Sequence, residues 1–282
     1  MFKFLSASIV GGIAVLLLVT GCGAPAEDSD TATKPSPSPT ETALEADAKQ
    51  LLADVGVVGN ESGKATLTKA NVPVAEGVSQ EFATNAAAIL REWYGRAALN
   101  PDSINAADLA TAESMTYTDF ALLPDFEDKI RERAAPETAF MASTTYMGGT
   151  ELIGSTFPTY AEFTSSLEDH DGYSTQSMIL RASTLYTVEL PDSTPGLMIS
   201  TRELTIESPQ GVDDVRLDWS HGWSHMVLGS DYCSYQVDHV FVPEASPEAQ
   251  EIVRQNAALV ISGAAQKADG WNGFAPGVEQ TC

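Results

Sequence analysis

The chain has 282 residues and a formal net charge of −24, because 39 Asp and Glu outnumber 15 Lys and Arg. This balance excludes nucleic acid and anionic lipid headgroups as natural partners, since proteins bind both through a surplus of basic side chains. The acidic side chains are interpreted mainly as a solvated surface; the alternative is attraction of cations or basic proteins. A hydrophobic content of 43% is enough for one ordinary core.

A short apolar segment follows Lys3 and ends in the run Val19-Thr20-Gly21-Cys22. It covers residues 4–19, which are 16 residues with two serines and two glycines, whereas a membrane-spanning helix needs about 20 mostly apolar residues. A cleaved signal segment therefore explains the pattern better than a transmembrane helix. The run resembles the signal peptide of a bacterial lipoprotein.

That resemblance implies that residues 1–21 are removed and that Cys22 carries a diacylglycerol and a fatty acid such as palmitate. Stable attachment needs more than one acyl chain, because each buried methylene contributes only about 0.8 kcal/mol. We therefore expect a protein anchored by lipid to the cell membrane, on the extracytoplasmic face.

The segment after the cysteine is predicted to be a tether. Residues 23–41 contain no aromatic or large aliphatic side chain, and residues 34–40 read KPSPSPT. Such a segment stays extended and solvated, because it has nothing to bury in a core. A proline-rich recognition ligand is the alternative. With residues 22–41 as the tether, residues 42–282 form a single predicted domain.

Helices are expected first in this domain. Thr42 and Glu45 have the spacing of a capping box at the start of the first helix, and apolar residues continue to Val55. A second amphipathic helix begins near Ser79 and is stopped by Asn100-Pro101. Shorter helices are expected after Asn105 and over residues 124–135.

The character then changes to β-branched and aromatic residues broken by turn residues. Strands are predicted over residues 138–146, 177–190, 197–207, 212–219, 223–228 and 232–242. The connections between them are short, so the strands should pair as an antiparallel meander. A final helix starts at Ser246-Pro247 and runs to about residue 268. Together these elements predict an α+β fold. Their order loosely resembles the NTF2-like cone, which implies a curved sheet able to enclose a pocket.

Two cysteines remain once Cys22 carries lipid. In an oxidising compartment Cys233 and Cys282 are expected to form a disulfide. It would close a loop of about 50 residues and contribute about 4 kcal/mol in the chain-entropy model. Free thiols or a redox pair are the alternatives, although no Cys-x-x-Cys spacing is present.

The candidate metal ligands are Asp218, His221 and His225. On a helix the two histidines would share a face, but on the predicted strand they would be about 13 Å apart unless the chain bends at Gly222. Asp231, Asp238 and His239 fall on the next predicted strand. Packing of tryptophan and histidine on a sheet is therefore the favoured interpretation, and we predict no cofactor.

Aromatic residues recur through the predicted sheet. They are Tyr173, Tyr186, Trp219, Trp223, Tyr232, Tyr235 and Phe241. Aromatic side chains on strands usually belong to the core, so that is the expectation; lining a pocket for an apolar or carbohydrate ligand is the alternative.

Two functional hypotheses follow. The favoured one is a non-catalytic surface lipoprotein that binds a small ligand or an envelope protein, because no nucleophile motif stands out. The alternative is an envelope hydrolase or metal-dependent enzyme that uses Asp218, His221 and His225, which requires a histidine within hydrogen-bond reach of a carboxylate.

Overall fold

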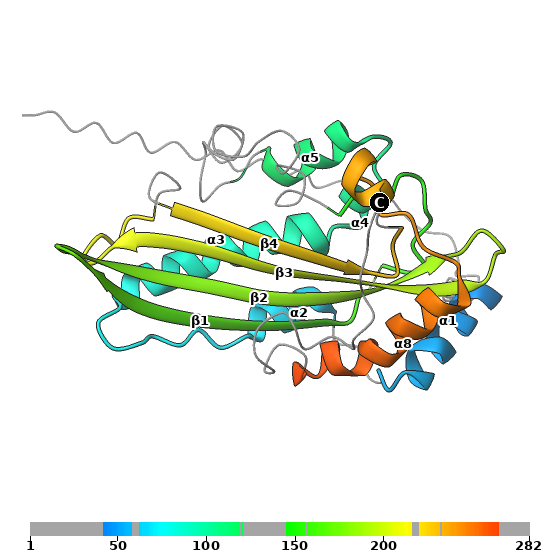
Figure 1. The fold of residues 1–282 in the computed structure, drawn as a ribbon, viewed down its shortest axis with the longest axis horizontal. Helices are drawn as coiled ribbons and strands as arrows, with labels where there is room; N and C mark the ends of the chain where they lie inside the picture. The colour runs from blue at the N-terminus through cyan, green and yellow to red at the C-terminus, as the bar shows by residue number, and fades with distance from the viewer. Residues whose placement is uncertain are drawn as a thin grey trace, which may run out of the picture. The chain divides into compact units, whose positions relative to one another are not determined.

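Four strands form an antiparallel sheet in the order β1-β2-β3-β4 (Figure 1). The strands are β1 (Thr159–His170), β2 (Tyr173–Glu189), β3 (Pro195–Pro209) and β4 (Ser220–Leu228). The computed structural model describes residues 42–57, 62–118, 120, 145–155, 157–215, 220–231 and 233–264, with side chains except at 220–225 and 236. These residues all belong to one compact unit, Glu41–Cys282. The predicted α+β fold, with helices first, a meander and a closing helix, is confirmed.

Three of the four strands overlap predicted ones, and three predictions fail on described residues. No strand is predicted from the sequence over β1. Of the predicted strand 138–146, the structure describes Thr145 and Tyr146, and both lie outside the sheet. Of the predicted strand 212–219, it describes residues 212–215, which also lie outside the sheet. The other residues of these two predicted strands lie outside the described residues. In the middle of the predicted strand 232–242 the chain instead forms the π-helix η1 (Ser234–Asp238). Its last turn ends at His239, whose φ of 60° is left-handed and incompatible with a continuing strand.

One face of the sheet, called here the first face, is covered by α3 (Gln80–Ala98). The helix begins where predicted, because the Ser79 hydroxyl accepts a hydrogen bond from the Phe82 N–H. Its buried stripe, including Trp93 and several alanines, packs against Met178 and Leu204. The small alanine side chains let the helix lie close to the strands. The neighbouring helices are α2 (Gly63–Lys69), α4 (Pro101–Ile104) and α5 (Leu109–Tyr117).

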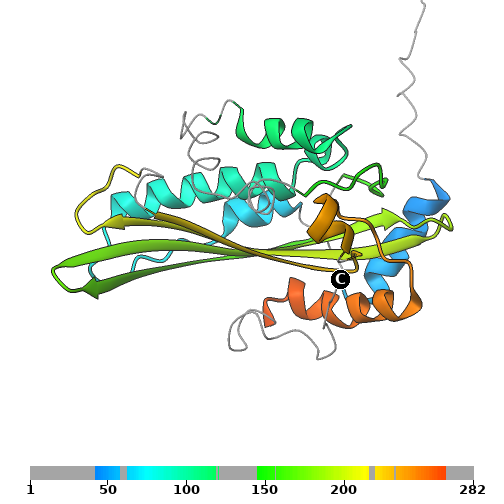
Figure 2. The same ribbon diagram turned by 45° about the horizontal axis from the view of Figure 1, so that its top comes forward.

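The opposite, second face is covered over only part of its length. Helices α1 (Ala43–Asp54) and α8 (Pro247–Ile261) pack there against Leu185, Leu197 and Ile199. Figure 2 shows α2 and α3 above the sheet, and the blue and orange helices α1 and α8 near one end beneath it. Both helices start at their predicted caps, since Thr42 with Glu45 makes the capping box and the Ser246 hydroxyl accepts from the Ala249 N–H. The predicted helix 124–135 lies outside the described residues.

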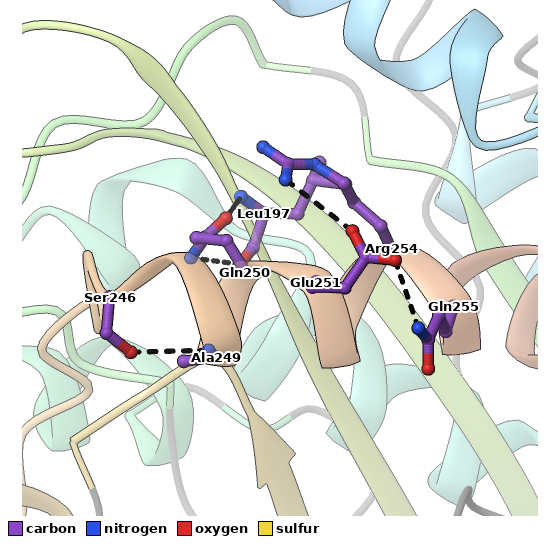
Figure 3. A network of polar contacts seen from close by, with 7 residues as sticks. All are labelled: Leu197, Ser246, Ala249, Gln250, Glu251, Arg254 and Gln255. Atoms are coloured by element: carbon purple, nitrogen blue, oxygen red, sulfur yellow. Dashed lines mark hydrogen bonds and ion pairs between the residues drawn. The ribbon is translucent and has the colours of Figure 1, made fainter.

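A buried glutamine fastens α8 to the sheet (Figure 3). Pairing of β3 with β4 begins at Ile199, so Leu197 extends beyond the end of β4. There the Gln250 side chain accepts a hydrogen bond from the Leu197 N–H at 2.9 Å, and its Nε2 donates to the carbonyls of Leu197 at 3.3 Å and Glu244 at 2.8 Å. The amide thus bonds the Leu197 N–H and carbonyl as a neighbouring strand would. Without these bonds the buried backbone groups would lack partners, which would destabilise the fold.

Candidate functional site

An open groove lies on the second face, at the end of the sheet near the β1–β2 turn. Its volume is about 580 Å³, within the range typical of small-ligand sites. The lining residues come from three strands and are Glu168, His170, Tyr173, Thr175, Ser177, Glu207, Ser208 and Pro209. Among the described elements, α1 and α8 cover the other end of this face. In the groove Glu168, His170 and Tyr173 are exposed, Thr175, Glu207 and Pro209 are half-buried, and Ser177 and Ser208 are buried.

Strand register explains why residues far apart in the sequence line one groove. Glu168 is opposite Thr175 in the β1–β2 pair, and Ser177 is opposite Glu207 in the β2–β3 pair. Alternate residues of a strand point to the same side of the sheet, so Thr175 and Ser177 bring both glutamates onto one face. The β1–β2 hairpin therefore assembles the groove together with the end of β3.

The aromatic wall of the groove is Tyr173. Its side chain is 62% exposed, which makes it the one exposed Tyr, Trp or Phe among the side chains that the structure describes. Its ring lies against the His170 ring, with centroids 5.0 Å apart and an interplanar angle of 31°. A ring held by a neighbour but open on its other side is a surface on which a ligand can stack.

The groove is acidic. Glu168 is exposed and Glu207 is half-buried, and within the described part of the chain neither carboxylate has an ion-pair partner. Further along the same face, the Arg181 Nε donates to the Glu203 carboxylate at 2.5 Å. That cation is therefore already engaged, and the two groove carboxylates keep their negative charge available for a ligand.

A second polar cluster is buried under α3 on the first face. Arg202 is fully buried, and its Nη2 donates to the Thr145 Oγ1 at 3.0 Å. The Tyr186 hydroxyl donates to the Ala98 carbonyl at 2.8 Å, and the hydroxyls of Tyr94 and Thr184 are 2.7 Å apart. Burial raises the pKa of Tyr94 and of Tyr186 and lowers that of Arg202. The bonds of Tyr186 and Tyr94 join α3 to β2, which gives the cluster a structural role.

The predicted histidine pair lies on β4. The register places His221 opposite Ile206 and His225 opposite Arg202, so both positions belong to the first face, away from the groove. Because both histidines lie on one strand, four positions apart, their Cα atoms are about 13 Å apart. The two side chains, and the whole of Asp218, lie outside the described residues. Among the side chains that are described, no group of three His, Cys, Asp or Glu is arranged to hold a metal ion.

The expectation that Asp231, Asp238 and His239 share a strand is wrong. Asp231 precedes the π-helix, and its carboxylate accepts from the Ser234 hydroxyl at 2.7 Å and from the Cys233 N–H at 3.1 Å. The Ser234 hydroxyl is the main reason that the pKa of this carboxyl is lowered. Asp231 therefore has a structural role, because it links the residues on which the π-helix begins.

The structure describes one of the three cysteines. Cys233 immediately precedes η1, whereas Cys22 and Cys282 lie outside the described residues. Lipidation of Cys22 and the bridge from Cys233 to Cys282 therefore stay predictions.

The expectation for the strand aromatics is confirmed in part. Tyr186, Tyr235 and Phe241 are core residues. Tyr173 is not, and sequence reasoning missed its groove partners Glu168 and His170 because it placed no strand there. Trp219 and Tyr232 lie outside the described residues, as does the side chain of Trp223.

No protein-family model, curated protein or solved structure matches this chain. None of the described helices has the length and apolar character needed to cross a membrane.

Proposed function

We propose that this protein is a lipid-anchored, extracytoplasmic binding protein that holds a small ligand, without catalysis, in the groove at the β1–β2 end of the sheet. The observation that carries the proposal is the exposed Tyr173 ring in a cavity of about 580 Å³. An exposed aromatic ring beside polar groups that converge from three strands is typical of a ligand site. An envelope protein that inserts a side chain into the groove is the second form of the same proposal.

The anchor is part of the proposal and rests on the sequence. Cys22 ends a segment too short to span a membrane, and the proline-rich tether would hold the domain away from the lipid surface. Replacing Cys22 by alanine should move the protein from the membrane fraction to the soluble one and abolish labelling with palmitate. Retention of C22A in the membrane would contradict the lipid anchor.

The binding function is tested on the full-length protein extracted in a mild detergent. Native mass spectrometry should show a retained small molecule or protein on the unsubstituted chain and its loss from Tyr173→Ala. A matched control is Val237→Ala, which removes another exposed apolar side chain, 69% exposed, in η1. Equal retention by all three proteins would place the binding site elsewhere.

The enzymatic alternative, a hydrolase or metal-dependent enzyme around Asp218, His221 and His225, makes a different prediction. Zinc at saturating concentration should then raise the melting temperature, because a metal that binds only the folded state stabilises it. An unchanged melting temperature would remove the metal site.

A further inference from the structure

The two groove carboxylates are placed on separate strands with β2 between them. Glu168 belongs to β1 and Glu207 to β3, and both lie on the second face. Neighbouring strands are about 4.8 Å apart, and the two residues are also offset by two positions along β2, because Glu168 is opposite Thr175 and Glu207 is opposite Ser177. Their Cα atoms are therefore about 12 Å apart. The groove therefore presents two negative charges at a distance from each other, and one small cation does not reach both equally.

The rest of the lining favours an organic cation. The half-buried Thr175 lies opposite Glu168 in the register, and its hydroxyl oxygen adds an acceptor for N–H donors. The Ser177 hydroxyl is buried and lies 2.7 Å from that of Ser166. The lining residues that the structure describes include no Lys or Arg, and the nearby Arg181 is engaged by Glu203. The open Tyr173 ring supplies a π face, which attracts a cation and packs against methylene groups.

From this arrangement we propose that the ligand is a small aliphatic diamine, with one ammonium group at Glu168 and the other at Glu207 and its methylene chain against Tyr173. The inference rests on the proposed binding function and names its ligand class. Hard metal ions fit the groove less well, since two separated carboxylates provide too few ligands for a coordination sphere. Anionic ligands are excluded by repulsion from both glutamates.

The test is calorimetric titration of the full-length protein, in a neutral detergent at low ionic strength, with three probes of equal chain length. They are 1,5-diaminopentane, pentylamine and 1,5-pentanediol, which carry two, one and no positive charges. The diamine should bind about 5-fold more tightly than the monoamine, the gain typical of one partly exposed ion pair, and the diol should not bind. Added salt should lower the affinity for the diamine, because it screens the attraction between exposed charges.

Glutamate-to-glutamine variants test whether the two groove carboxylates bind the diamine. Glu168→Gln and Glu207→Gln should each lower the diamine affinity about 3- to 5-fold, to roughly that of the monoamine. Glu248→Gln is the control, because Glu248 is an exposed acidic residue in the first turn of α8. It should leave the affinity unchanged.

Three results would overturn the diamine proposal: equal binding of diol and diamine, no binding of the diamine at millimolar concentration, or equal affinities in E168Q, E207Q and E248Q. The binding function is tested separately, by native mass spectrometry of the molecule that the unsubstituted chain retains and Tyr173→Ala loses. A neutral molecule that is lost from Y173A would leave the function standing and refute the diamine.

Discussion

The two ends of the β2–β3 hairpin are built differently. Near the turn that joins β2 to β3, residues 196–202 of β3 are all buried, so both faces of the strand are covered. Toward the β1–β2 turn, residues 203–209 alternate between half-buried and buried. The same pair of strands is therefore a two-sided core at one end and a one-sided sheet at the other.

The side chains of the second face account for this difference. Under α1 and α8 they are Leu185, Leu197 and Ile199, whereas beyond the helices they include Arg181, Glu203 and Glu207. Burying charged groups without partners is costly, so helices stabilise only the apolar end. The groove is what remains where the second face is polar, and this is why we place function there and stability at the other end.

The largest expected effect on stability comes from truncating second-face residues of β2 at the two ends of the strand. Leu185→Ala should lower the free energy of unfolding by about 3 kcal/mol, because it leaves a cavity between β2 and the two helices. Ile179→Ala, on the same face but half-buried toward the groove, should cost only about 1 kcal/mol. Urea denaturation measures both. Equal losses would show that the two ends are equally covered, and the comparison would fail.

A smaller effect is expected at the attachment of α8. Gln250→Met keeps the side-chain length but leaves the Leu197 N–H without its buried acceptor, so the free energy of unfolding should fall by about 2 kcal/mol. Gln255→Met is the control, since Gln255 is exposed and its side chain donates to Glu251 on the same helix (Figure 3). It should change stability by less than about 0.5 kcal/mol. A similar loss in both variants would mean that the Gln250 bonds add nothing beyond helix propensity.

The smallest expected change in stability is at the groove itself. Tyr173→Ala removes an exposed ring, so in the absence of ligand the free energy of unfolding should shift by no more than about 0.5 kcal/mol. With ligand bound, the unsubstituted chain should gain stability and the variant should not. A loss of more than about 2 kcal/mol in Y173A without ligand would identify the ring as part of the core, as first expected from the sequence.

Local signals predicted a large part of the fold. Thr42, Ser79 and Ser246 each start a helix because a side-chain oxygen satisfies an N–H group that the first turn leaves without a partner. Strands β2, β3 and β4 were predicted from β-branched and aromatic runs between turn residues. Strand β1 was missed because charged and hydroxyl residues dominate its second face, and its first-face residues Phe163 and Leu167 are too widely spaced to stand out.

The candidate site was less predictable than the fold. Tyr173 was recognised as an aromatic strand residue, but its exposure depends on what covers it, and composition carries no such information. Glu168 and Glu207 are 39 positions apart and meet on one face only through their pairing with β2. The residues 232–242 were predicted as strand from the same β-branched and aromatic content, although the chain forms a π-helix there.

The sequence by itself determined the starts of α1, α3 and α8, the antiparallel order of consecutive strands and the acidic character of the chain, because each depends on neighbouring residues or on composition. Only the tertiary structure decided which end of the sheet is covered. Helices α1 and α8 come from opposite ends of the domain sequence and meet on the same part of the second face. Burial is set by such distant contacts, so the groove and the exposure of Tyr173 arise only when the chain has folded.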